Sequence, residues 1–330
     1  MSTPEALLAD VAPPSPSGNR VRLAGLGVAL PDRIVENTEI AARAGVDEDW
    51  IVRRTGIRTR RRARPGVELV DLAAAAAQAT IADAETDPAA IDLVLLATVS
   101  QGRPMPNVAP QVATRVGASA AAAFDVGAAC SGFLAGLATA AAYIEAGRAG
   151  RVLLVGADLL SRQTDPSDRK TAALFGDGAA AVLLTASAEA APWTIELGAD
   201  GSAAELIAND RRSGLIRMNG HDTFIHAVNR MEQVTRSVCA KAGIGTDEVD
   251  LFVFHQANGR ITRTLTERLG ADPDRVIDCI AELGNTSAAS VPLALDHARA
   301  AGRLAQGDKV LLCAIGSGLI WGAALIEWER

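Results

Sequence analysis

Cys130 has the setting of a nucleophile. It stands in the segment GAACSGF, between a short run of small residues and a long apolar stretch. A thiol attacks carbonyl carbons as the thiolate, and a helix N-terminus lowers the pKa of a cysteine placed there. Ala128, Ala129 and Gly132 leave room for a bulky substrate beside the sulfur. Free cysteine is also among the most buried residue types, so a plain packing role is the competing interpretation. The neighbouring Ser131 lacks an adjacent base, and we interpret it as a polar residue of the first helical turn.

Two further polar residues and one turn could assist such a nucleophile. His255 follows directly on an apolar strand in LFVFHQANGR, where an imidazole can act as donor or base; the alternative is a buried histidine bonded to the backbone. Asn285 in GNTSAAS offers an amide, and its alternative role is a helix cap. The GSG turn at 316–318 can present backbone N–H groups to a developing oxyanion, or serve only as a tight turn.

An arginine-rich segment stands out in a chain whose net charge is −7. Residues 53–64 contain seven arginines, which could form a docking patch for a phosphate-bearing or acidic partner or simply a solvated face. Trp50 lies just ahead of them, and its flat ring beside arginines suits a nucleotide base.

Composition excludes several classes of function. The negative net charge argues against a general nucleic-acid binder. The N-terminus lacks the pattern of a secretory signal. The uncharged stretch 126–144 is 19 residues long, but it is rich in Ala and Gly, so we predict a buried helix rather than a membrane span. Widely spaced cysteines without a C-x-x-C pair indicate neither disulfides nor a metal site, and they favour a reducing, cytoplasmic setting. These cysteines are Cys130, Cys239, Cys279 and Cys313.

The positions of these residues depend on strands and helices that alternate along the chain. Continuous apolar runs predict strands buried on both faces at 93–98, 151–157, 251–255 and 309–315. Ala-rich stretches of helical length predict helices at 68–82, 131–147, 223–242, 259–269 and 290–301. This alternation indicates an α/β protein with largely parallel strands.

The sequence also repeats itself. The segments around Asp92 and Asp250 resemble each other, as do those that begin at Arg151 and Lys309, and both pairs are 158 residues apart. We therefore predict two pseudo-symmetric halves, 21–185 and 186–330, after a flexible N-terminal tail at 1–20.

Two Gly-Arg pairs at helix ends refine this alignment. They end at Arg148 and Arg303, and the same offset of 155 residues places Cys130 opposite Asn285. The two polar residues would therefore occupy equivalent stations of the two halves and could face one site.

Taken together, the motifs resemble the beta-ketoacyl-acyl-carrier-protein synthase III family of the thiolase superfamily. The resemblance spans residues 21–330 and implies a thiolase-like fold, with two halves forming a layered α-β-α-β-α core. The motifs that carry it are DEDWIVRRTGIRTRR, DVGAACSGF, TDPSDRKTAALFGDGAA, HQANGRI, GNTSAAS and GSGLIWGAAL.

The resemblance implies a two-step reaction. Cys130 would take an acyl group from acyl-CoA by thioester exchange. His255 and Asn285 would bind the malonyl thioester carbonyl on acyl carrier protein and stabilise the enolate formed as carbon dioxide leaves. The carbanion would then attack the acyl thioester, while the backbone N–H groups of Cys130 and Ser317 form the oxyanion hole.

The resemblance also implies binding residues and partners. Acyl-CoA would be a substrate, and no cofactor would be permanently bound. Met105 would cap the acyl pocket of a partner subunit, which implies a homodimer. Arg260 and Arg263 would dock acyl carrier protein. The CoA and pantetheine contacts would come from Trp50, Arg54, Arg169, Gly220, Phe224 and Asn258.

Departures from the family pattern leave the acyl substrate open. Ser317 stands where glycine is frequent, Lys170 and Gly259 replace other residue types, and the segment 201–220 is short. One alternative keeps the Cys130 acyl-enzyme but passes the acyl group to an alcohol, an amine or a carrier protein without condensation. A further alternative is an inactive partner subunit.

Overall fold

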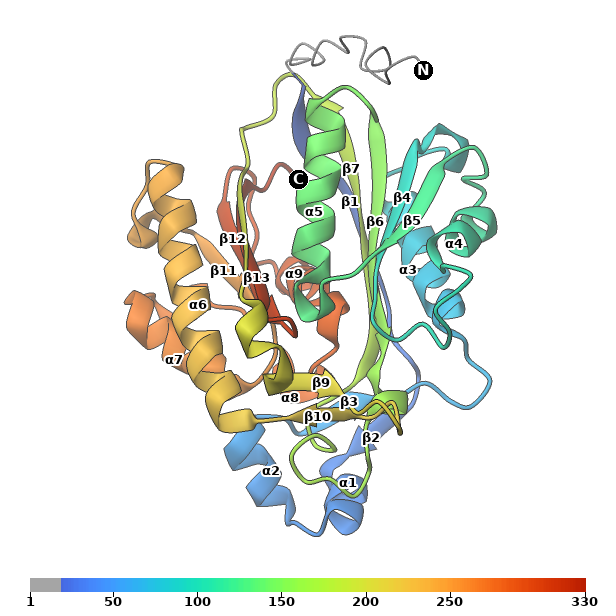
Figure 1. Ribbon diagram of the computed structural model, residues 1–330. Coiled ribbons are helices and arrows are strands. Elements are labelled where there is room, and N and C mark those ends of the chain that lie inside the picture. The colour runs from blue at the N-terminus through green and yellow to red at the C-terminus, as the bar shows by residue number, and fades with distance from the viewer. Residues whose placement is uncertain (1–18) are drawn as a thin grey trace, which may run out of the picture.

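Two β-sheets with helices between and outside them make up residues 19–330, the part of the chain that this computed structural model describes (Figure 1). The predicted tail at 1–20 lies almost wholly outside the described residues. The first sheet has the strand order β1 (Arg20–Ala29), β7 (Asp177–Ser187), β6 (Arg151–Leu159), β4 (Leu93–Ala97) and β5 (Ala122–Val126). The second has the order β11 (Leu251–Phe254), β12 (Lys309–Gly316), β13 (Ile320–Glu327) and β8 (Thr194–Ala199).

Helices form three layers around these sheets. Between the sheets lie α5 (Gly132–Glu145) and α9 (Ser290–Ala300), whose apolar side chains share one core with both sheets. The outer face of the first sheet is covered by α3 (Leu69–Asp83) and α4 (Ala109–Val116), and that of the second by α6 (Gly220–Lys241) and α7 (Gly259–Leu269). The predicted α-β-α-β-α layering is confirmed.

The central strands are buried on both faces because their side chains alternate between two cores. In β4, Leu93 and Leu95 point into the core between the sheets, whereas Val94 and Leu96 pack under α3 and α4. This explains why the strands appear in the sequence as continuous apolar runs.

The prediction of largely parallel strands was wrong. In the two main sheets of residues 19–330, β6–β4–β5 and β11–β12 are parallel, whereas β1–β7–β6 and β12–β13–β8 are antiparallel. The physical reason is clearest between β12 and β13, where residues 317–319 form the whole connection. A parallel crossover needs a dozen or more residues, so a connection this short returns the chain antiparallel.

The two sheets have matching strand orders. Strands β1, β7, β6 and β4 follow one another in the first sheet as β8, β13, β12 and β11 do in the second. The strands β4 and β6 of the first sheet correspond to β11 and β12 of the second. Each pair is 158 residues apart in the chain, as the sequence repeat predicted. The boundary between the halves at 185 and 186 stays a prediction.

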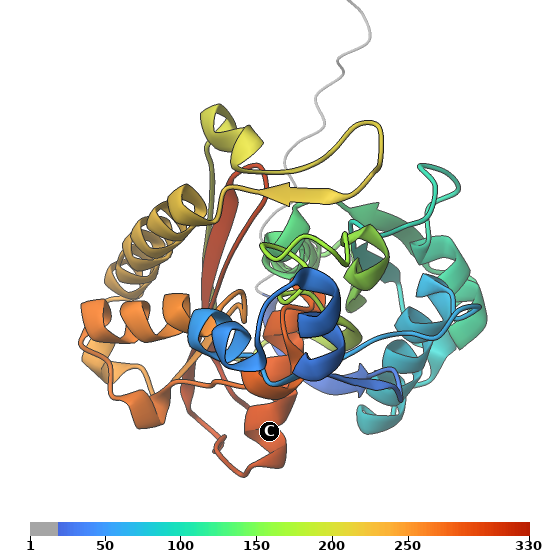
Figure 2. The same cartoon turned by 90° about the horizontal axis from the view of Figure 1, so that it is seen from below.

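Smaller elements gather at one end of the layers, seen end-on in Figure 2. They include two antiparallel pairs of short strands and three short helices: β2 (Ile34–Glu36), β3 (Thr59–Arg61), β9 (Ile207–Asn209), β10 (Ile216–Met218), α1 (Asn37–Ala44), α2 (Glu48–Thr55) and α8 (Ile280–Leu283). Within residues 19–330, no helix has the length and apolarity needed to cross a membrane.

Candidate active site

A cavity of about 1020 Å³ opens among these smaller elements and reaches the ends of the central strands. Its walls include Cys130, His255 and Asn285, which belong to three segments far apart in the sequence. The cavity thus brings together the three polar residues that the sequence singled out.

Cys130 lies in a single 3-10 turn, Ala129–Ser131, that joins β5 to α5. The preceding Ala129 has a φ of 47°, in the left-handed region that non-glycine residues rarely occupy. Such strain is typical of functional turns and here directs the thiol to the cavity. Ser131 is fully buried, and its hydroxyl donates a hydrogen bond to the Ile320 carbonyl at 2.9 Å. This hydrogen bond gives Ser131 a structural role.

The resting thiol is less acidic than the sequence suggested. Burial raises the pKa of Cys130 to about 11, and the nearby Asp158 carboxylate adds to the increase. The expected lowering of the pKa by the N-terminus of α5 is therefore outweighed, because removing the thiolate from water costs more than the helix end offsets.

His255 presents a neutral imidazole to the cavity. It follows β11 directly, and its backbone N–H donates to the Cys313 carbonyl at 2.8 Å, which extends the pairing of β11 with β12. The residue is 1% exposed, and burial lowers the pKa of the ring to about 3. Within the described residues its Nδ1 has no hydrogen-bond partner.

Asn285 is fixed by its own backbone. Its N–H donates to the Leu174 carbonyl and its carbonyl accepts from the Gly176 N–H, both at 2.9 Å. Its side-chain Oδ1 accepts from the Ser287 N–H at 2.9 Å. This orients the amide and leaves the Nδ2 group as the donor toward the cavity.

The end of β12 presses against the turn that carries Cys130. A Cβ atom at Gly316 would lie 2.7 Å from the Cys130 nitrogen and 3.1 Å from the Ala128 carbonyl oxygen. Only glycine therefore allows this approach, which brings residue 317 beside the nucleophile. The Ser317 hydroxyl donates to the Ile207 carbonyl at 2.5 Å and ties this loop to β9.

The wider part of the cavity carries cations and aromatic rings. The guanidinium of Arg54 lies 6.0 Å from the centre of the Trp50 ring, and that of Arg260 lies 5.1 Å from the Phe224 ring. Asn258 accepts from the Arg260 N–H at 2.9 Å and donates to the Arg54 carbonyl at 3.2 Å, joining α7 to α2. Three further predicted or neighbouring residues line the same region: Arg169, Lys170 and Gly220.

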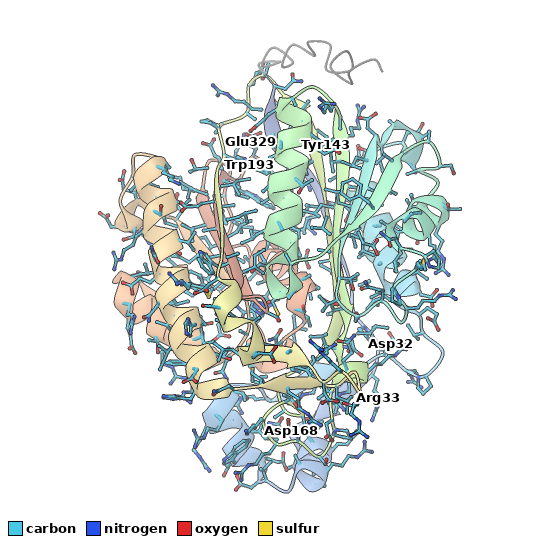
Figure 3. All side chains as sticks on the ribbon, in the orientation of Figure 1. Asp32, Arg33, Tyr143, Asp168, Trp193 and Glu329 are labelled. Carbon is cyan, nitrogen blue, oxygen red and sulfur yellow. The ribbon has the colours of Figure 1, made fainter. Side chains whose placement is uncertain are left out.

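Figure 3 shows where this region lies. Its label for Asp168, the neighbour of Arg169, stands at the end of the molecule that carries α1 and α2. The labels for Tyr143 and Trp193 stand at the opposite end of α5, where both side chains pack against the core between the sheets. The cavity therefore opens at the end away from Tyr143 and Trp193.

Two predicted site residues do not line this cavity. Met105 is 78% exposed on the loop before α4, and Arg263 is exposed on α7. Their predicted roles, toward a partner subunit and a carrier protein, stay predictions.

The arginine run is not one continuous docking patch. Arg60 is fully buried and donates to the Asn37 side chain and the Ala173 carbonyl, each at 2.8 Å. Burial lowers its pKa to about 10. This arginine holds the segment in place, while Arg53, Arg54 and Arg58 are exposed.

Two residues near the nucleophile escaped the sequence reasoning. Asp158 interrupts the apolar run that follows Arg151 in β6, a signal that is visible in the sequence. Ser287 lines the cavity and has a left-handed φ of 53°, a conformation that its local sequence does not indicate.

Comparisons with known proteins agree with this geometry. A family model described as 3-oxoacyl-[acyl-carrier-protein (ACP)] synthase III matches residues 124–214, and the model of its C-terminal part matches residues 239–328. Beta-ketoacyl-[acyl-carrier-protein] synthase III 2 of Streptomyces coelicolor is 46% identical over 308 residues, which cover 92% of this chain and 93% of the relative.

Solved structures show the same similarity. The 3-oxoacyl-[acyl-carrier-protein] synthase III from Aquifex aeolicus has a TM-score of 0.90 and 39% identity, covering 94% of this chain and all of that chain. The priming beta-ketosynthase of the R1128 polyketide biosynthetic pathway also has a TM-score of 0.90, with 33% identity and coverage of 96% and 98%.

Proposed function

Because the chain belongs to the beta-ketoacyl-acyl-carrier-protein synthase III family, we propose that it condenses an acyl group from acyl-CoA with malonyl-acyl carrier protein. The product is a beta-ketoacyl-acyl carrier protein, which starts a fatty-acid or polyketide chain. The observation that carries this proposal is the convergence of Cys130, His255 and Asn285 on one cavity.

In the first step Cys130 takes the acyl group. Its sulfur attacks the thioester carbon of acyl-CoA, a bond to Sγ forms, and CoA leaves as a thiol. The backbone N–H groups of Cys130 and Ser317 stabilise the oxyanion of the tetrahedral intermediate. The close approach at Gly316 supports this role because it brings residue 317 beside the nucleophile.

In the second step the malonyl thioester loses carbon dioxide. The negative charge moves to the thioester oxygen, where two neutral donors, the His255 imidazole and the Asn285 Nδ2 group, would lower the barrier. Burial lowers the pKa of His255 and so keeps the ring neutral. This supports the assignment, because the step requires a neutral hydrogen-bond donor at the thioester oxygen. The enolate carbon then attacks the acyl thioester and releases Cys130.

The wide part of the cavity suits CoA and the pantetheine arm of acyl carrier protein. The Trp50 ring would stack on the adenine beside Arg169, and Arg54 would lie near the phosphates. Gly220, Phe224 and Asn258 would line the pantetheine channel. Arg260 and Arg263 on α7 would face acidic carrier protein outside it.

Met105 would reach the acyl pocket of a second copy, so we expect a homodimer. A cytoplasmic location and the absence of a permanently bound cofactor also belong to this proposal.

Acylation of Cys130 tests the first step. Incubation with short acyl-CoAs should add one acyl mass to the protein, and peptide mapping should place it on Cys130. A Cys130→Ala variant should remain unmodified. Equal acylation of this variant would contradict the assignment.

Malonyl-acyl carrier protein separates condensation from simple acyl transfer. The acylated enzyme should release carbon dioxide and form a beta-ketoacyl product, and His255→Ala or Asn285→Ala should reduce this release at least 100-fold while acylation of Cys130 persists. Transfer of the acyl group to an alcohol or amine without carbon dioxide release would support the alternative.

A further inference from the structure

We propose that Ser287 and Asp158 form a proton relay behind Cys130, in which the thiol proton passes through the Ser287 hydroxyl to the Asp158 carboxylate. This inference rests on the proposed function only in taking Cys130 as the nucleophile. It assigns a use to a buried carboxylate that the two-step reaction leaves without one.

Asp158 is a fully buried carboxylate near the end of β6. Its Oδ1 accepts from the Thr98 hydroxyl and the Val99 N–H at 2.9 Å and from the Ser100 hydroxyl at 2.8 Å. Its Oδ2 accepts the Ala288 N–H at 3.3 Å and keeps a further lone pair. The donors hold the carboxyl in one orientation, while burial raises its pKa and so favours the uptake of a proton.

Ser287 lies between this carboxyl and the nucleophile. It is 1% exposed, occupies a left-handed φ of 53°, and lines the cavity. Its hydroxyl makes no hydrogen bond of good geometry at rest, although both the Cys130 thiol and the Asp158 carboxyl lie within its reach. A buried hydroxyl held in a strained conformation between an acid and a base is the arrangement that a relay needs.

The packing of two short turns fixes this arrangement. The turn of Cys130 packs on the turn Ser287–Ala289, and a Cβ at Gly132 would lie 3.5 Å from that of Ala288. Gly156, two residues before Asp158, approaches so closely that a Cβ there would lie 2.5 Å from the Ala288 carbonyl. This packing therefore holds the Ser287 turn beside both the Cys130 turn and the strand that carries Asp158.

The relay solves an electrostatic problem. A thiolate that forms by losing its proton to bulk water must be desolvated in this pocket, which is why burial raises the pKa of Cys130. Passing the proton to Asp158 exchanges one buried anion for another, and the charge of the cluster stays at −1.

The proton balance closes over both steps. As Sγ attacks the acyl-CoA carbon, its proton moves to Ser287 Oγ, and the Ser287 proton moves to Asp158. The C–S bond to CoA breaks, and the CoA thiolate takes a proton from water. In the condensation the C–S bond to Cys130 breaks, and the proton returns along the same path to Sγ.

The other titratable groups nearby do not compete for this role. The His255 imidazole, across the cavity, is kept neutral by burial. The Asp177 carboxylate on the adjacent β7 accepts from the Ala63 N–H at 2.8 Å and from the Ser161 N–H and hydroxyl at 2.8 and 2.7 Å. Asp158 is thus the carboxyl that faces Ser287.

Alkylation of Cys130 by iodoacetamide as a function of pH tests the relay, with the modified residue located by peptide mass spectrometry. While the cluster keeps its charge of −1, the fraction of thiolate is set internally, so the wild-type rate should vary less than threefold between pH 6.5 and 8.5. Asp158→Asn lacks the acceptor, and its rate should rise about tenfold per pH unit, as for an isolated thiol.

Removing the bridge should have the same effect as removing the acceptor, because the Ser287 hydroxyl donates to the thiolate and accepts from the protonated Asp158, and these hydrogen bonds stabilise the form of the cluster that carries the thiolate. Without them the thiolate forms mainly by loss of its proton to water. In Ser287→Ala and Ser287→Gly the alkylation rate should rise about tenfold per pH unit. Glycine adopts the left-handed φ without strain, so the Ser287→Gly variant should keep the native fold. Thr98→Val is the matched control, since it removes a hydrogen bond to the same carboxylate but leaves the bridge and should keep the flat profile.

A merely structural role would change the rates without changing the slopes. A tenfold slope in the wild type, or a flat profile in Asp158→Asn and both Ser287 variants, would overturn the proposal. The assay contains no acyl-CoA, so a flat wild-type profile in an enzyme that never forms an acyl-Cys130 would retain the relay and reject the proposed function.

Discussion

At the scale of single residues, burial sets the charge of the polar groups in the site. His255 is buried at the end of β11, and burial lowers its pKa to about 3. Burial acts on Cys130 in the opposite direction and raises its pKa, since in each case it disfavours the charged form. The pocket at rest therefore holds a neutral ring and a neutral thiol.

Because His255 is buried in its neutral form, we expect the folded protein to lose stability as the pH falls. The unfolded chain binds a proton at this histidine below its ordinary pKa of 6.5, whereas the folded chain does so only near pH 3. The unfolding free energy should therefore fall by about 1.4 kcal/mol per pH unit as the pH drops through this window. Urea unfolding of the wild type and His255→Gln should show the wild type losing about 2 kcal/mol more between pH 6.5 and pH 5. Equal losses would mean that the ring is not buried in its neutral form.

At the scale of elements, two short turns each pack directly against the backbone of a strand. β12 ends at Gly316 directly against the Cys130 turn, and β6 passes Gly156 directly against the Ser287 turn. Helices and sheets of the two halves thus meet through backbone atoms at the nucleophile, which accounts for the small residues around it.

Gly316→Ala should displace the Cys130 turn. The added methyl group has no flexible side chain to push aside, since backbone atoms of Cys130 and Ala128 lie within 3.1 Å of it. Acyl transfer to Cys130, followed by intact-protein mass spectrometry, should slow at least 100-fold, and the melting temperature should fall.

Gly201→Ala provides the control, because a Cβ there would meet no atom within 4 Å. It should leave both rate and melting temperature unchanged. Wild-type acylation of Gly316→Ala would show that the approach at β12 does not position the site.

At the scale of the whole molecule, the first sheet ends at an edge that the chain leaves open. In the part of the chain described, β5 pairs with β4 alone, and its residues are partly exposed. Met105 lies on the loop that follows β4 and is 78% exposed, which is unusual for a large apolar side chain. Both features support the proposed homodimer.

Sedimentation equilibrium should therefore give twice the mass of the 34.1 kDa chain. Met105→Ala should shift the preference toward longer acyl-CoAs at least fivefold if this side chain caps a partner's pocket. A monomer with unchanged preference in the variant would reject the role of Met105.

The sequence by itself determined the layers and the chemistry. Strands buried on both faces must be apolar throughout, so β4, β6, β11 and β12 were visible as apolar runs, and the repeat at 158 residues related them. The settings of Cys130, His255 and Asn285 at element ends indicated a nucleophile and two polar groups that could assist it, and the resemblance to a known family implied the acyl chemistry.

Only the tertiary structure decided what surrounds those residues. Strand direction, the desolvation that raises the pKa of Cys130, and the burial of Arg60 all depend on which segments pack together. The line from Cys130 through Ser287 to Asp158 joins residues up to 157 positions apart in the chain. Local sequence encodes residue type and periodicity. The burial of a side chain, and the pKa shift that burial causes, arise from contacts between distant segments.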